Sequence, residues 1–162
     1  MIIKPFPYQN DAGFPDEYNE SGCYAHVIAK IAFDEEAFSI DPVEMINSVL
    51  PLAQAEGVLD REYTVGDPDR LFCLFGLWTI YTDKWESMNR QCEVDEREAV
   101  RFYYADEKEK GAKADKFHFV VGDGFGKCAW DPWHGGSKAV RVGRAIDKRV
   151  FKIIGRTYGG GC

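Results

Sequence analysis

Cys23 is the first residue whose type and position could carry covalent chemistry. It stands in the stretch "NESGCYAHVIAKIA" (residues 19–32), where small and polar residues precede an apolar repeat. The unpaired N–H groups and the dipole at the start of a helix favour a thiolate there, and the N–H of the cysteine itself can serve as an oxyanion donor. A lone cysteine is more often a buried structural thiol. The nucleophile interpretation therefore depends on the residues that fold beside it.

His118 and Asp131 flank a predicted β-hairpin. In "KFHFVVGDGFGKCAWDPW" (residues 116–133), glycines and an aspartate mark a tight turn between two apolar runs. With the turn centred on residues 124–125, the antiparallel register places His118 directly opposite Asp131, with Cβ atoms about 5 Å apart. A carboxylate at that distance fixes the tautomer of an imidazole and stabilises its charged form. We therefore expect Cys23, His118 and Asp131 to act as nucleophile, base and orienting carboxylate.

A zinc site is the competing interpretation of the same residues. Cys23 and His26 lie one helical turn apart, and His118, Cys128 and Asp131 are close in sequence. A structural zinc site would show paired C-x-x-C spacing, which this chain lacks. The glycine-rich turn also lacks the Lys-Ser/Thr and the helix that follow a phosphate-binding loop. We therefore expect neither a metal nor a cofactor, and we expect His26 on the helix surface or, as the alternative, lining the cleft.

The elements that must position these residues change character along the chain. Helices are predicted from Ser21 to about Phe33, from Asp41 to Gly57 with Pro51 as a point of kinking, and from Asp67 to Gly76. After Gly76 the hydrophobic period becomes that of strands. The predicted strands are residues 77–85, 97–105, 117–121, 127–131 and 149–154. Helices followed by antiparallel strands predict an α+β fold.

Length and composition limit the possible functions. The chain of 162 residues fits one domain, residues 1–162, with a flexible tail at residues 158–162. Its formal charge of −7 argues against nucleic acid as the partner. The longest apolar run, residues 71–81, is too short to span a bilayer. Five scattered cysteines and the absence of a signal peptide predict a cytoplasmic protein without disulfides or a membrane partner.

The order and local motifs of the three candidate residues resemble the papain-like cysteine peptidase superfamily, and most closely its compact bacterial C39-like branch. The matching stretches are "ESGCYAHVIAKIA", where a Gly-Cys pair opens a helix, and "FHFVVGDGFGKCAWDP", with a His on an apolar strand and a later Asp-Pro. The stretch "GGSKAVRVGRAIDKRVFKI" also resembles the end of an uncharacterised spirochaete and phage family. The resemblance covers residues 19–33 and 116–154.

This resemblance implies a papain-like fold and a thiol hydrolase that cleaves a peptide or isopeptide amide in a peptide or protein substrate through a Cys23–His118–Asp131 triad. In the C39-like branch a glutamine about six residues before the cysteine supplies the second oxyanion donor. Glu17 occupies that position here, and Gln9 and Asn19 are the alternatives. Two other functions stay open: a peptidoglycan amidase or endopeptidase, and a non-catalytic phage or bacterial binding module that retains the fold.

Overall fold

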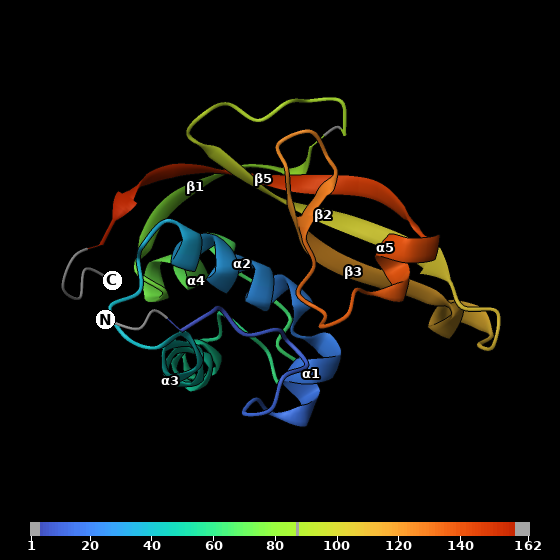
Figure 1. Ribbon diagram of the computed structural model, residues 1–162, viewed down its shortest axis with the longest axis horizontal. Coiled ribbons are helices and arrows are strands. Elements are labelled where there is room, and N and C mark those ends of the chain that lie inside the picture. Colours follow the sequence, from blue (N-terminus) through green and yellow to red (C-terminus); the bar gives the residue numbers. More distant parts are fainter. Residues whose placement is uncertain (1–3, 87, 158–162) are drawn as a thin grey trace.

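Most of the helical structure lies in the first half of the chain and most of the strands in the second, as the change of hydrophobic period predicts. The computed structural model describes residues 4–86 and 88–157, so the expected flexible tail at residues 158–162 lies outside the described residues. The α+β fold packs the N-terminal helices against a five-stranded antiparallel sheet (Figure 1). The helices are α1 (Asp16–Ser21), α2 (Cys23–Asp34), α3 (Pro42–Ala55), α4 (Pro68–Leu74) and α5 (Lys138–Val142), with a 3-10 turn η1 (Gly111–Ala114). The sequence pattern did not indicate α1, η1 or α5.

Capping residues explain where α3 and α4 begin. The side chain of Asp41 accepts a hydrogen bond from the N–H of Glu44 at 3.2 Å, and proline follows at the first helical position. Asp67 caps α4 in the same way. Gly76, with φ at +97°, follows α4 and is suited to ending a helix. Pro51 lies within α3, which continues as one helix from Pro42 to Ala55.

The sheet has the strand order β1-β5-β2-β3-β4, with every neighbouring pair antiparallel. Its strands are β1 (Leu77–Glu86), β2 (Glu96–Ala105), β3 (Asp115–Gly122), β4 (Cys128–Trp130) and β5 (Arg144–Arg156). The short strand β4 pairs only with the end of β3, through Val121 with Trp130 and Gly122 with Cys128. The part of β3 before Val121 therefore forms an edge that a side chain from another element can approach.

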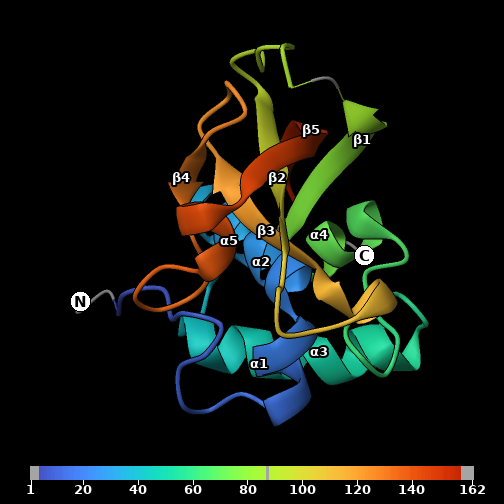
Figure 2. The same ribbon diagram turned by 90° about the vertical axis from the view of Figure 1, so that its right-hand side faces the viewer.

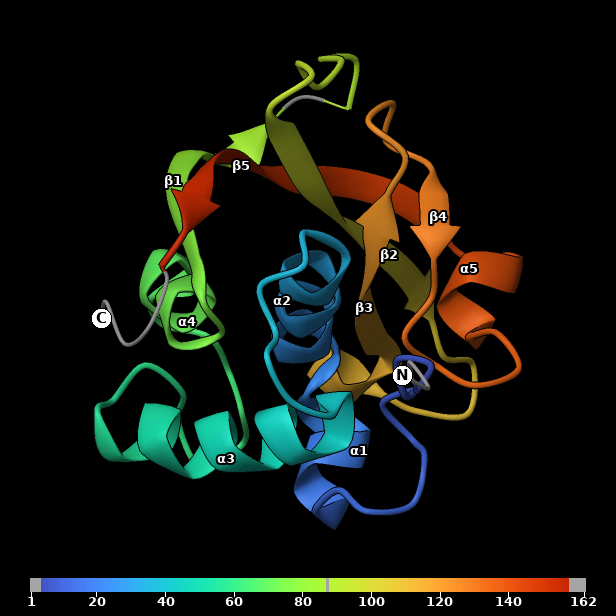
Figure 3. The same cartoon turned by 60° about the vertical axis from the view of Figure 1, so that its left-hand side comes forward.

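Helix α2 stands against the inner face of the curved sheet, between α4 and β1 on one side and β3 and β4 on the other (Figure 3). Val27, Ile28 and Ile31 on α2 are almost completely buried and belong to the main hydrophobic core. Helices α1 and α3 lie below it (Figure 2). Since α2 begins at Cys23, this packing fixes the position of the cysteine relative to β3.

His26 is fully buried, so the expectation that it lies on the helix surface is wrong. Its Nε2 lies 2.8 Å from the carbonyl oxygen of Pro7, and its Nδ1 lies 2.5 Å from the hydroxyl of Tyr18. Nε2 donates to the carbonyl, which leaves Nδ1 to accept from the tyrosine. Burial lowers the pKa of His26 to about 4, and the imidazole is therefore neutral. His26 thus fastens α1 and the N-terminal segment to α2.

The cysteines differ from expectation in one respect. Cys23, Cys92 and Cys128 are free, but Cys73 on α4 is disulfide-bonded. The prediction of a chain without disulfides is therefore wrong. Disulfides persist mainly in oxidising compartments, so the cysteines no longer support a cytoplasmic location. Within residues 4–86 and 88–157, no helix has the length and apolar character needed to cross a membrane.

Candidate active site

Cys23 is the first residue of α2, so its amide is among the N–H groups that have no partner within the helix. Gly22 separates Cys23 from α1, and a residue larger than glycine would not fit at this position. A Cβ atom on Gly22 would lie 2.5 Å from the ring of Tyr18 and 2.6 Å from the carbonyl oxygen of the same residue. Close packing between the two helices therefore requires glycine before the cysteine. The same packing places Cys23 next to the sheet.

His118 on β3 and Asp131 immediately after β4 are in contact, as predicted from the hairpin. His118 Nε2 lies 2.8 Å from Asp131 Oδ1. The predicted register is wrong, because β3 pairs with β4 through Val121 with Trp130 and Gly122 with Cys128, and this ladder does not extend to His118. The ladder between β3 and β4 is shifted, and β4 ends at Trp130. Asp131 therefore reaches the histidine from the end of the strand.

The imidazole of His118 lies between Asp131 and Cys23. A carboxylate only accepts hydrogen bonds, so Nε2 carries the proton shared with Asp131 and Nδ1 is left for the sulfur. The Cys23 side chain is hydrogen-bonded to His118 and to the backbone N–H of Phe119. These contacts occur on the part of β3 that β4 leaves unpaired. The short β4 thus leaves room for the start of α2 to meet the sheet edge.

The charges of the three side chains support one another. Burial raises the pKa of the Cys23 thiol, but the hydrogen bond and charge of His118, together with two backbone N–H groups, outweigh it and bring that pKa below its usual value. Burial lowers the pKa of His118, but hydrogen bonds to Asp131 and Cys23 and their charges raise it to about 9. Both shifts favour the same charged state, a thiolate next to an imidazolium.

Asp131 is held by backbone donors as well as by His118. Its Oδ1 also accepts from the N–H of Trp133 at 3.0 Å, and its Oδ2 accepts from the N–H of Ser137 at 2.8 Å. Burial raises the pKa of Asp131, but these hydrogen bonds and the one from His118 bring it down to about 2. The carboxylate therefore stays ionised and keeps one orientation towards the imidazole.

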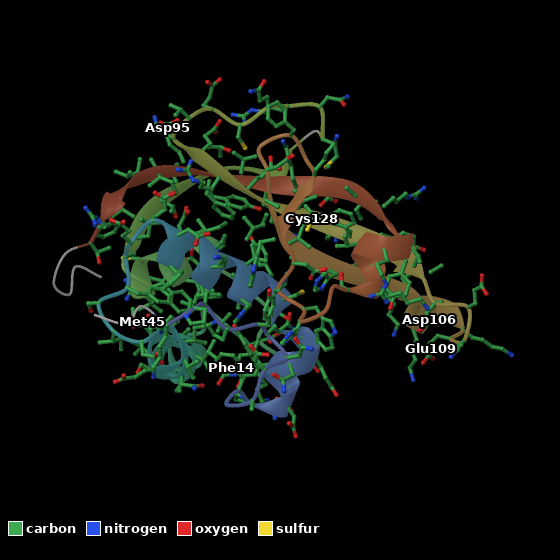
Figure 4. All side chains as sticks on the ribbon, in the orientation of Figure 1. Phe14, Met45, Asp95, Asp106, Glu109 and Cys128 are labelled. Carbon is green, nitrogen blue, oxygen red and sulfur yellow. The ribbon has the colours of Figure 1, made fainter. Side chains whose placement is uncertain are left out.

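The other free cysteines have the opposite environment. Burial, a hydrogen bond to Glu98 and the charge of that carboxylate raise the pKa of Cys92 to about 12. Burial and the charges of Asp131 and Asp123 raise the pKa of Cys128, at the start of β4 (Figure 4), to about 11. Because the thiolate is the reactive species, Cys23 is distinguished from both by its environment.

The three candidates for a second oxyanion donor differ in burial and in hydrogen bonding. Glu17 is exposed on α1. Gln9 is buried, and its side-chain amide donates to the carbonyl oxygens of Tyr18 and Asn19 at 3.1 and 3.0 Å. Asn19 is half-buried, and its Oδ1 has no hydrogen-bond partner among the described residues. The amide of Gln9 is therefore occupied in holding the end of α1.

The N-terminal segment supports the loop that carries Asp131, a contact that sequence reasoning missed. The N–H of Gln9 donates to the carbonyl oxygen of Pro132, and the N–H of His134 donates to the side chain of Asn10, both at 2.7 Å. Contacts across more than 120 residues of chain leave no periodic signal in a single sequence. We infer that this segment helps to fix the end of β4.

Metal-ligating side chains do not gather in the described part of the chain. Across residues 4–86 and 88–157, no group of three or more His, Cys, Asp or Glu residues is placed to hold an ion. A cavity of about 560 Å³ instead adjoins Cys23 and is lined by the start of α2, residues 63–69 and the inner face of the sheet.

We predict that Asp131 sustains the raised pKa of His118. In a Cys23→Ala background, which uncouples the two titrations, the pKa of His118 should stay above about 6.5, and adding Asp131→Asn should bring it below that value. Burial alone then acts on the imidazole and disfavours its charge. NMR titration of the histidine ring protons measures both values, with the exposed Asp16→Asn as control. An unchanged pKa in the Asp131 variant would contradict the orienting role.

Comparison of the chain with protein-family models, with curated proteins and with solved structures finds no match in any of the three.

Proposed function

We propose that the protein is a thiol hydrolase, a cysteine peptidase that cleaves a peptide or isopeptide amide. The observation that carries this proposal is the continuous contact from Cys23 through His118 to Asp131. It joins a nucleophile at a helix start, a base with one nitrogen for the sulfur, and a carboxylate that fixes the other nitrogen. The arrangement of a cysteine helix packed on an antiparallel sheet also supports the resemblance to papain-like peptidases.

The first half of the reaction forms a thioester. The Cys23 thiolate attacks the carbonyl carbon of the amide, and the carbonyl electrons move onto the oxygen, which the N–H of Cys23 can bind. His118 then gives its Nδ1 proton to the amide nitrogen as the C–N bond breaks and the amine leaves. Asp131 keeps the imidazole in position throughout and remains ionised.

The second half restores the enzyme. His118 is now neutral and takes a proton from a water molecule as that water attacks the thioester carbon. The C–S bond breaks, the acid product leaves, and the sulfur departs as the thiolate that the imidazolium stabilises. Each turnover therefore consumes one water and needs no further reagent, which agrees with a site made from the chain's own side chains.

Exposure of a peptide library to the protein, with new termini identified by mass spectrometry, tests this function. The library should include cross-linked and linear peptidoglycan stem peptides, because an amidase or endopeptidase would use the same triad. We expect cleavage that is lost in the Cys23→Ala variant and retained in Cys128→Ala. Cleavage that survives Cys23→Ala would refute the proposal. If neither the general peptides nor the peptidoglycan stem peptides are cleaved, and Cys23 shows ordinary thiol reactivity, the result favours a binding module instead.

A further inference from the structure

The cavity beside Cys23 contains one feature that the triad does not use. Among the described residues that line it, Arg149 is the only basic one. Arg149 lies on β5 opposite Ala99 of β2, and Ala99 is buried in the main core, so this position faces the helices. A volume of about 560 Å³ is within the range of sites for small ligands. A cation on an inner sheet face, in a cavity of this size, needs an explanation.

Two aromatic rings hold the guanidinium close to the nucleophile. The Cζ atom of Arg149 lies 4.8 Å from the ring centre of Tyr24 and 4.4 Å from that of Phe119. Tyr24 directly follows Cys23, and the N–H of Phe119 binds the cysteine sulfur. Cation–π contacts of this kind hold a guanidinium against aromatic faces and leave N–H groups for hydrogen bonds. Arg149 therefore sits beside the two residues that flank the sulfur.

The acidic side chains of the cavity are directed to the protein itself. Asp69 accepts from the hydroxyl of Thr79 at 2.8 Å with one oxygen and from the N–H of Tyr81 at 3.1 Å with the other. Asp67 caps α4 by accepting from the N–H of Arg70 at 3.1 Å. A guanidinium has five N–H donors, so contacts within the protein still leave it able to bind a ligand carboxylate.

We propose that the cavity binds a carboxylate of the substrate through Arg149, which makes Arg149 the residue that determines specificity. The proposal rests on the proposed function, since it assumes that the attacked bond lies at Cys23. The carboxylate can belong to an acidic side chain next to that bond or to a free C-terminus, because both present the planar oxygen pair that a guanidinium binds in a bidentate way. A cationic side chain would be repelled by the guanidinium, and a purely apolar one would offer its N–H donors no acceptor.

Alkylating probes that extend from the sulfur into the cavity test the proposal without knowledge of the substrate. The cysteine thiolate attacks the CH₂ carbon of an iodoacetyl group, the C–S bond forms, and iodide leaves with the bonding electrons. The four probes are iodoacetyl-glutamate α-amide, iodoacetyl-glutamine free acid, iodoacetyl-glutamine α-amide and iodoacetyl-lysine α-amide. They carry a side-chain carboxylate, an α-carboxylate, no charge and a cation. The alkylation rate of Cys23 with each probe is normalised by its alkylation rate with iodoacetamide.

We expect at least one carboxylate probe to react about tenfold faster than the neutral probe, as a charge-assisted bidentate contact allows. The first two probes tell an acidic side chain from a free C-terminus. The preference should disappear in Arg149→Met and persist in Arg61→Met, where an exposed cation near the cavity loop is removed. Equal normalised rates for all probes, or a preference for lysine, would overturn the proposal. High iodoacetamide reactivity with no probe preference would leave the proposed function standing.

Discussion

Replacement of His118 by alanine should remove most of the thiolate at Cys23. Without the imidazolium, burial is the largest remaining influence and is opposed only by two backbone N–H groups, so we expect the pKa of the thiol at or above its ordinary value of about 8.5. At about pH 6.5, roughly two units below that ordinary value, no more than about one thiol in a hundred should then be ionised. The direct measurement is the ultraviolet absorbance of the thiolate as a function of pH. An inflection that stays well below the ordinary value would contradict the role of His118.

The alkylation rate should change less than the thiolate fraction. A more basic thiolate is a better nucleophile, with a Brønsted coefficient of about 0.4–0.5. The higher reactivity of each thiolate therefore offsets part of the decrease in their number. We therefore expect the iodoacetamide rate at Cys23 to fall on the order of tenfold at about pH 6.5. His134→Ala is the matched control, because that imidazole is exposed and paired with Asp11. The raised pKa values of Cys92 and Cys128 keep their contribution to the signal small.

The elements of the fold were predictable where local chemistry decides them. Aspartate caps followed by proline start α3 and α4 where expected, and the change to a strand period after Gly76 marks the start of the sheet. Helix α1 lacks such a signal, because Pro15 at its N-cap makes no side-chain hydrogen bond. Helix α5 has only five residues, which is too few for a hydrophobic period to be recognised.

The candidate site shows the same division between local and long-range information. The contact between His118 and Asp131 follows from a hairpin, which is a local structure, so the sequence could predict it. The strand register could not be predicted in detail, because β3 and β4 pair with a shift and the turn between them contacts residues outside the hairpin. One of these contacts is the hydrogen bond from the N–H of Gly126, within the turn, to Glu98 on β2. The role of Arg149 depends on packing between distant segments and has no sequence signal.

That hydrogen bond belongs to a buried charged pair on the other face of the sheet. Lys148 on β5 and Glu98 on β2 are 0% and 1% exposed, and Lys148 Nζ lies 2.7 Å from Glu98 Oε1. The lysine also donates to the carbonyl oxygen of Arg90, and Glu98 accepts from the thiol of Cys92. Lys148 and Glu98 therefore tie the connection between β1 and β2, and the turn before β4, to the centre of the sheet.

Lys148→Met should lower the free energy of unfolding by about 3–5 kcal/mol, because Glu98 is then left as a buried charge without its cation. The double variant Lys148→Met, Glu98→Gln should recover a large part of this loss, since a neutral amide does not need a counter-charge. Lys152→Met on the same strand is the control. Its ammonium is half-exposed and lies 3.8 Å from Asp95 (labelled in Figure 4), so the change should stay within about 0.5 kcal/mol.

Urea unfolding followed by tryptophan fluorescence measures all three variants. The same samples connect the buried pair to the site, because Gly126 lies in the turn that leads through β4 to Asp131. If Lys148 positions this turn, Lys148→Met should also raise the pH at which the Cys23 thiolate forms, even in conditions where the variant is folded. If Lys148→Met loses no more unfolding free energy than Lys152→Met, water must reach the carboxylate of Glu98. A large loss of unfolding free energy with an unchanged Cys23 titration would mean that the Lys148–Glu98 pair stabilises the fold but does not position the site.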